Sequence, residues 1–319
     1  MKKRFFSLVL AGLLALSATG CGSSASVAGD DQLNILATTY PIYLFACSVT
    51  EGAENVEVSL LVNEQTSCLH DYTLSVTDMK AIEKADVIIL NGAGFETFME
   101  DALAGSKAAV IDCSEGIELL PSTGHHDHNH GHDHGHETVE EHFDPHYWLD
   151  PARAMQMMEN IRTGMVAADA VQAELYSANL QTISGRYDFA NPGRLAALAT
   201  GHSSLSSICT QLDLITFHDG FQYFADAFDL TLLKAIEEEE GAEASAAEIK
   251  EIVSQIKEHN VSALFVEKNG SDSTARAIAR ETGVEIYALD MIMSGDGTDI
   301  QAYIDAMSAN LQTVAEALK

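Results

Sequence analysis

Positively charged side chains are scarce in this 319-residue chain. It has 17 lysine and arginine residues against 48 aspartate and glutamate residues, which gives a formal net charge of −31 at pH 7. A surface this acidic repels nucleic acid and anionic lipid head groups, and it raises the local concentration of cations. The composition therefore excludes a nucleic-acid partner and favours a cationic ligand.

Cysteine is also rare, and no two cysteines have the Cys-x-x-Cys spacing. This absence argues against a structural zinc knuckle and against a thioredoxin-like redox site. Four cysteines follow Cys21, and they allow three pairings or free thiols, among which the sequence does not choose. These four are Cys47, Cys68, Cys113 and Cys209.

The chain has one long apolar run, Phe5 to Leu16, which is too short to span a bilayer. A basic start precedes it, and small residues separate it from Cys21. The pattern predicts a secretory signal over 1–20 with a lipoprotein cleavage site. Acylation of Cys21 then anchors the chain to the outer face of a bacterial membrane through a flexible leash over 21–31. An ordinary signal peptide with an incidental Cys21 is the alternative.

Imidazole side chains crowd one segment. Dense imidazole is poor at packing a core, but it offers many neutral nitrogen ligands to a borderline-soft divalent ion. The segment predicts auxiliary, weak metal sites, and a solvated polar loop is the alternative. Its histidines are His125, His126, His128, His130, His132, His134 and His136.

From Leu33 onward, short apolar runs alternate with amphipathic stretches. This alternation predicts an α/β fold with two lobes, each a mainly parallel sheet flanked by helices. We expect an N-terminal lobe over 32–168 that includes a His-rich loop over 124–143. A C-terminal lobe follows over 191–319, and one long rigid helix over 169–190 joins the two.

The apolar pattern also predicts individual elements. Residues 151–183 form almost unbroken helix-forming sequence, in which methionines at helical spacing fill a core. The predicted strands are 33–37, 56–62, 86–90, 108–111, 213–217, 230–235, 263–266 and 285–289. The other predicted helices are 77–85, 96–103, 220–228, 245–259, 274–282 and 299–318.

Candidate metal ligands lie just beyond predicted strands. His70 follows the second strand by a short loop, while His218 and Asp290 directly follow strands of the C-terminal lobe. In open α/β sheets, ligands bind outside the carboxyl ends of the strands. His146, where the His-rich loop returns to the lobe, completes a site of three imidazoles and one carboxylate, which suits four-coordinate zinc.

Three of the candidate ligands also have an interpretation that involves no metal. His70 suits a surface turn, and Asp290 suits a cap or turn after its strand. His218 suits a helix cap together with Asp219. His202 is a rival third imidazole, although its glycine and serine neighbours suit a helix start.

Two further points concern single histidines. The second ring N–H of His146 has two possible acceptors, Asp144 and Asp150, either of which would fix the tautomer. His259 lies near the end of a predicted helix, where a cation interacts favourably with the helix dipole.

A zinc hydrolase needs an open coordination position and a glutamate that activates water, often arranged as His-Glu-x-x-His. That motif is absent, because His136 and Glu137 are followed by a histidine only at 142. We therefore expect no enzyme.

The chain resembles the zinc and manganese (cluster A-I) solute-binding lipoproteins of ABC importers, in the zinc type with a His-rich loop. The resemblance covers nearly the whole body of the chain. It departs at Cys68-Leu69, where relatives often have Asp-Pro, and at Ala244, after the acidic run Glu237 to Glu240. The segments that carry it are Leu36–Pro41, Ala85–Glu96, Asp144–Pro151, Phe217–Ala225 and Ala279–Gly283.

The resemblance implies two α/β lobes with the metal in the cleft between them, and it supports His70, His146, His218 and Asp290 as ligands. It implies a receptor outside the cytoplasm, monomeric and lipid-anchored, that delivers Zn²⁺ to an ABC permease with its ATPase. Three imidazoles favour zinc over manganese, which prefers more oxygen ligands. A manganese receptor, or a surface lipoprotein that buffers zinc or acts as an adhesin, is the alternative.

Overall fold

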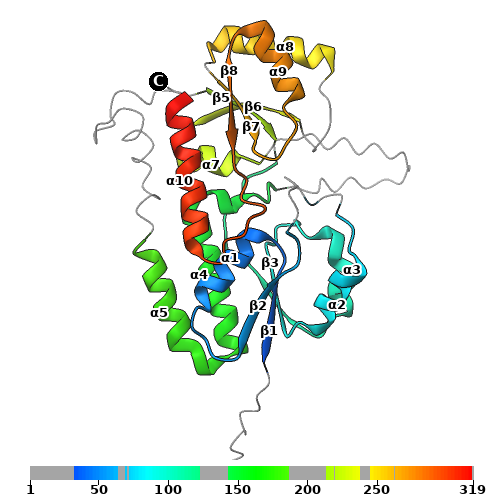
Figure 1. The fold of residues 1–319 in the computed structure, drawn as a ribbon, viewed down its shortest axis with the longest axis vertical. Coiled ribbons are helices and arrows are strands. Elements are labelled where there is room, and N and C mark those ends of the chain that lie inside the picture. Colours follow the sequence, from blue (N-terminus) through cyan, green and yellow to red (C-terminus); the bar gives the residue numbers. More distant parts are fainter. Residues whose placement is uncertain are drawn as a thin grey trace, which may run out of the picture. The chain divides into compact units, whose positions relative to one another are not determined.

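The fold is taken from a computed structural model (Figure 1). At residues 213, 214, 217, 218, 236 and 237 only the backbone is described. The predicted signal and leash, His70, His202, the histidines of 125–136, Cys68 and Cys209 lie outside the described residues. The structure describes residues 32–63, 69, 72–122, 143–186, 213–218, 220–237, 245–261 and 263–317.

The first sheet has four parallel strands in the order β2-β1-β3-β4. Its central strands are apolar and buried, and Ile35, Ile88 and Ile89 have no exposed surface. Continuous apolar strands are expected where helices cover both faces of a parallel sheet. The strands are β1 (Leu33–Ala37), β2 (Val56–Leu60), β3 (Val87–Leu90) and β4 (Ala109–Asp112).

The second sheet repeats this arrangement, with four parallel strands in the order β6-β5-β7-β8. In each sheet the strand order reverses beside the first strand of the lobe, β1 or β5, and such switch points are where α/β proteins bind ligands. The two lobes predicted from the sequence are thus confirmed. The strands are β5 (Asp213–His218), β6 (Thr231–Glu237), β7 (Ala263–Glu267) and β8 (Glu285–Leu289).

The helices begin at recognisable caps. Ser75 and Ser245 each form a capping box with the acidic residue three positions later. The helix α1 was not predicted, because its apolar residues surround the whole helix and show no amphipathic period. The α-helices are α1 (Tyr40–Val49), α2 (Val76–Lys84), α3 (Glu100–Gly105), α4 (Pro151–Ala168), α5 (Ala173–Ser184), α7 (Gln222–Ala227), α8 (Ala246–His259), α9 (Ser273–Thr282) and α10 (Ile300–Ala317).

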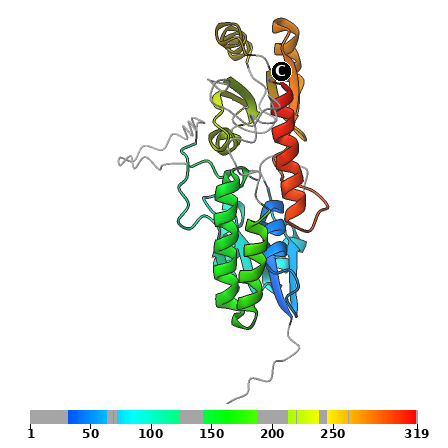
Figure 2. The ribbon, with the colours of Figure 1, turned by 90° about the vertical axis from the view of Figure 1, so that its left-hand side faces the viewer.

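The prediction of nearly unbroken helix over 151–183 is wrong in one respect, because the helix is interrupted at Asp169. This residue leaves the helical conformation, and its carboxylate accepts hydrogen bonds from the backbone N–H of Val171 and the hydroxyl of Tyr176. Short polar side chains that bond to nearby backbone compete with the helix in this way. A 3₁₀ turn (Ala170–Gln172) follows, and α5 packs back against α4 (Figure 2).

The methionines of this region do fill the core, as predicted, since Met158 and Met165 have no exposed surface. The C-terminal helix α10 packs on α1 in the first lobe, where the rings of Phe45 and Tyr303 meet edge to face at 5.1 Å. One buried apolar cluster consequently includes residues from both lobes.

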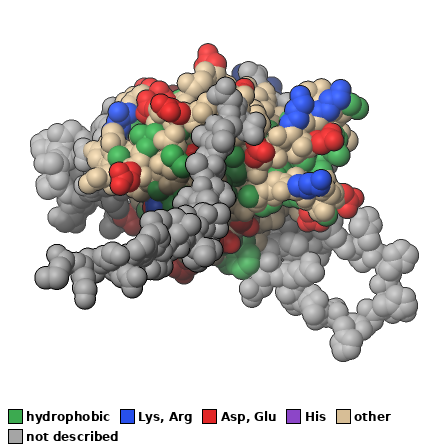
Figure 3. Space-filling view, turned by 90° about the horizontal axis from the view of Figure 1, so that it is seen from below, with side chains coloured by type: hydrophobic (Ala, Val, Ile, Leu, Met, Phe, Trp, Pro, Cys, Tyr) green, Lys and Arg blue, Asp and Glu red, His purple; other side chains and the backbone are tan. Residues whose placement is uncertain are grey.

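Charges of both signs appear on the face shown in Figure 3, interspersed with apolar side chains, and most of the visible lysine and arginine lies toward its right-hand side. Within the described ranges, no helix is both long and apolar enough to cross a membrane.

Candidate metal centre

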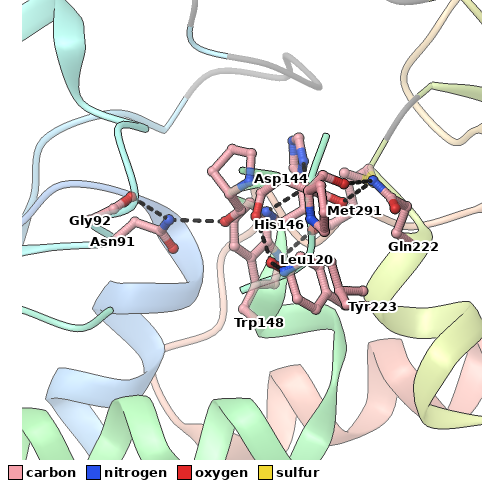
Figure 4. A network of polar contacts seen from close by, with 11 residues as sticks. Asn91, Gly92, Leu120, Asp144, His146, Trp148, Gln222, Tyr223 and Met291 are labelled. Atoms are coloured by element: carbon pink, nitrogen blue, oxygen red, sulfur yellow. Dashed lines mark hydrogen bonds and ion pairs between the residues drawn. The ribbon is translucent and has the colours of Figure 1, made fainter. Parts of the chain in front are cut away.

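His146 is a buried imidazole with a fixed ring orientation. Its side chain lies just before a 3₁₀ turn (Tyr147–Leu149), and the residue is 2% exposed. Its Nδ1 donates to Asp144 Oδ1 at 2.7 Å, and its backbone N–H donates to the same oxygen at 2.9 Å (Figure 4). A proton on Nδ1 selects the tautomer in which Nε2 carries the lone pair, which is the form of imidazole that binds zinc.

Two aromatic rings pack against this imidazole. The ring centroid of Phe95 lies 5.8 Å from that of His146 in an edge-to-face arrangement, and the ring centroid of Trp148 lies 5.2 Å from that of His146. Packing of this kind restricts the ring to one rotamer, so little conformational entropy is lost when it binds a ligand.

Asp144 is itself held by the helix that follows β5. Gln222 Nε2 donates to Asp144 Oδ2 at 3.3 Å, and the Tyr223 hydroxyl donates to the Asp144 carbonyl at 2.8 Å (Figure 4). His218 ends β5, four residues before Gln222. The His146 segment is therefore in contact with α7, which begins four residues after His218.

Of the two possible acceptors, Asp144 is the one that the His146 ring contacts in the structure. Asp150 instead caps α4, where its Oδ1 accepts from the Ala152 backbone N–H at 2.7 Å. Its Oδ2 accepts from Arg153, which also pairs with Asp226 at 3.1 Å. Asp150 thus orders the start of the helix rather than the imidazole.

Asp290 comes one residue after β8, and the side chain of Asn310 fixes its backbone. Asn310 Oδ1 accepts from the Asp290 N–H, and Asn310 Nδ2 donates to the Asp290 carbonyl, both at 2.8 Å. The carboxylate of Asp290 accepts from the Ile292 N–H at 2.7 Å and pairs with Lys268 at 3.0 Å. The expected turn role of Asp290 is therefore present, with a second oxygen directed at a cation.

The Asp290 segment lies against the His146 segment. The carbonyl of Met291 accepts a hydrogen bond from the Trp148 indole N–H at 2.9 Å, and the Trp148 carbonyl accepts from Tyr303 at 2.7 Å. Both aromatic side chains are fully buried. Two of the predicted ligands are thus on adjoining segments, one from each lobe.

The first lobe supports His146 through a buried polar network. Asn91 Nδ2 donates to the Pro145 carbonyl at 3.0 Å, and the Asn91 backbone N–H donates to Glu96 at 2.6 Å. Glu96 also accepts from Gly92 and from the Thr38 hydroxyl. Burial raises the pKa of Glu96 to about 7, against the lowering effect of these hydrogen bonds.

The remaining predicted residues are His218, His70, His259 and the cysteines. His218 is the last residue of β5, where its backbone pairs with Glu237, and Leu69, just before the undescribed His70, is buried. Where side chains are described, no group of three or more histidine, cysteine or acidic residues could hold a metal ion. His259 ends α8 as expected, with Asn260 as a left-handed C-cap. Cys47 and Cys113 are free thiols.

Sequence reasoning missed three supporting residues. Asn310 and Asn91 carry no local signal, because each works through a hydrogen bond to a segment distant in the sequence. Lys268 was detectable in principle, because it lies two residues beyond the predicted strand 263–266, and the structure pairs this strand with the one that precedes Asp290.

The chain is similar in sequence to known zinc-uptake proteins. Residues 35–317 match a family model described as zinc-uptake complex component A, periplasmic. The zinc-binding lipoprotein AdcA of Streptococcus pneumoniae is 30% identical over 99% of this chain, which spans 61% of that relative's length. The high-affinity zinc uptake system protein ZnuA of Bacillus subtilis is 27% identical, with 100% of this chain and 99% of the relative covered.

Solved structures show the same fold. A crystal structure of ZnuA has a TM-score of 0.73 at 26% identity, covering 91% of this chain and 100% of that one. The Zn(II)-bound ZnuA-like domain of Streptococcus pneumoniae AdcA has a TM-score of 0.69 at 27% identity, covering 90% and 99%. The match over nearly the whole chain, together with the two-lobed fold, shows that this chain belongs to the family of zinc-uptake complex component A proteins.

Proposed function

We propose that this chain is an extracytoplasmic receptor that captures Zn²⁺ and delivers it to an ABC permease and its ATPase for import. The observation that carries the proposal is the buried imidazole of His146, which Asp144 fixes in the metal-binding tautomer. A buried histidine held by a carboxylate is the usual second-shell arrangement of a protein zinc ligand.

The proposed ligands are His70, His146, His218 and Asp290. Two observations support this set. His218 and Asp290 both lie at the carboxyl ends of strands in the same parallel sheet. The Asp290 segment also contacts the His146 segment. Three nitrogen donors and one oxygen donor suit a tetrahedral zinc ion, whereas manganese prefers more oxygen.

The remaining expectations complete the proposal. The histidines of 125–136 collect ions weakly beside the main site, and acylated Cys21 anchors a monomeric receptor at the outer face of the membrane. The role requires capture and release of the ion and no catalytic step.

Calorimetric titration with zinc tests the proposal. We expect one tight site and several weak ones in the full chain, loss of the tight site in His146→Ala, and loss of only the weak sites when 125–136 are deleted. An unchanged tight site in His146→Ala would refute the assignment. Competition with manganese on metal-stripped protein then establishes the preferred ion.

A further inference from the structure

Lys268 and Asp290 are neighbours at the edge of the second sheet. The strands β7 and β8 pair in parallel with Glu267 opposite Leu289, and the Lys268 backbone N–H donates to the Leu289 carbonyl at 2.8 Å. Each of the two residues therefore lies one position beyond its strand. Their side chains meet in an ion pair, with Lys268 Nζ 3.0 Å from Asp290 Oδ2.

The Asp290 carboxylate has both oxygens engaged. Oδ1 accepts from the Ile292 backbone N–H at 2.7 Å, a bond within the turn, and Oδ2 faces the ammonium group of Lys268. The bond from Ile292 holds one carboxylate oxygen within the turn, and Asn310 fixes the backbone of Asp290 through its N–H and its carbonyl. A metal ion that binds Asp290 through Oδ2 therefore competes with the ammonium group for this oxygen.

The two partners differ in exposure. The Lys268 side chain is 64% exposed, whereas that of Asp290 is 22% exposed. An exposed ion pair contributes little to stability, since water solvates the separated ammonium group well. Lys268 can therefore leave Asp290 at small cost, while the carboxylate stays in place.

We infer that Lys268 is an internal competitor, which pairs with Asp290 in the metal-free state and is displaced when zinc binds. This inference rests on the proposed function. An ammonium group and a dication repel one another, so their joint occupation of one carboxylate oxygen is unfavourable. The lysine lowers the affinity of the site and speeds release of the ion. For a protein that hands its cargo to a partner, a faster release is useful.

Four variants test this inference in the full chain: Lys268→Met, Lys268→Arg, Asp290→Asn and the double variant Lys268→Met/Asp290→Asn. Zinc affinity is measured by competition with a chelator, and zinc dissociation by stopped flow. We expect Lys268→Met to bind zinc roughly 3- to 20-fold more tightly, mostly through slower dissociation. Lys268→Arg keeps the cation and should not bind more tightly than the wild type.

The matched control is Lys234→Met. Lys234 lies in the same lobe and pairs with Glu251 at 3.3 Å, away from Asp290, so its loss removes the same charge without freeing a proposed ligand. We expect Lys234→Met to bind zinc as the wild type does. In the Asp290→Asn background, Lys268→Met should give no gain in affinity.

The outcomes separate the inference from the proposed function. Unchanged affinity in Lys268→Met, while His146→Ala loses the tight site, overturns the inference and leaves the receptor intact. An equal gain with and without Asp290 also overturns it, because the lysine would then act by charge alone. A wild-type chain with no tight zinc site overturns both.

Discussion

The indole N–H of Trp148 donates a hydrogen bond to the main-chain carbonyl of Met291 at 2.9 Å. Trp148 comes two residues after His146, and Met291 comes one residue after Asp290. The bond is fully buried, and Tyr303 holds Trp148 from the C-terminal helix through a second bond of 2.7 Å. The segments that carry two proposed ligands from different lobes are thus joined by one buried hydrogen bond, and a second bond holds Trp148 in place.

Tyr303→Phe tests how much the hydrogen bond from Tyr303 to the Trp148 carbonyl contributes to stability. The substitution removes one hydroxyl and leaves the buried Trp148 carbonyl short of a partner, so we expect the free energy of unfolding to fall by about 1 to 2 kcal/mol. Urea denaturation measures the change. Tyr287→Phe is the control, because its hydroxyl bonds to the exposed Glu285, and it should change stability by less than about 0.5 kcal/mol. Equal effects of the two substitutions would contradict the account.

Asp144→Asn should weaken zinc binding about 10- to 100-fold with little change in fold, because the amide no longer fixes the His146 tautomer as a carboxylate does. Titration with zinc measures the loss. Asp150→Asn is the matched control, since asparagine retains the helix cap and Asp150 does not contact His146 through any hydrogen bond found in the structure. If Asp150→Asn weakened binding as much as Asp144→Asn, the second-shell assignment would be wrong.

Asn310→Ala should both destabilise the protein and weaken zinc binding. It leaves the N–H and the carbonyl of Asp290 without their partner, at a cost of about 2 to 4 kcal/mol, and it releases the carboxylate from its fixed position. Met165→Ala, at a fully buried position in α4, should destabilise by a similar amount but leave zinc affinity unchanged. Loss of stability in Asn310→Ala with unchanged zinc affinity would remove Asp290 from the ligand set.

Glu96 makes stability depend on pH. Its pKa is raised from 4.5 to about 7 in the folded protein, so between these values the unfolded chain releases a proton that the folded chain retains. Stability contributed by this site is therefore lost as pH rises from about 4.5 to about 7, and it is constant above that range.

The comparison with Glu96→Gln isolates this effect, because other titrating groups are common to both proteins. The free energy of unfolding of the wild type, relative to Glu96→Gln, should fall by roughly 2 to 3 kcal/mol between pH 5 and pH 8. Denaturation curves across this range measure the difference. A relative stability that rises with pH would mean that the three donors to Glu96 outweigh its burial.

Much of the fold follows from local sequence pattern. The strand Leu33–Ala37 has the predicted bounds, and α8 begins after Ser245, whose capping box is visible in the sequence. The pattern failed where local signals compete with tertiary contacts. The apolar α1 carries no helical period, and the break at Asp169 depends on a bond to Tyr176 that propensity does not reveal.

The candidate site, like the fold, could be predicted from the sequence only in part. His146 and its partner were predictable, since Asp144 is two residues away, but the choice of Asp144 over Asp150 depended on which carboxylate caps α4. The contributions of Asn310 and Lys268 depend on the pairing of elements far apart in the sequence, which no short motif records.

The most direct test of the account is anomalous diffraction at the zinc edge from crystals of the zinc-loaded chain. We expect one strong peak about 2.0 to 2.2 Å from His146 Nε2, with His70, His218 and Asp290 at similar distances. A strong peak that lies away from His146, with no zinc at this imidazole, would contradict it.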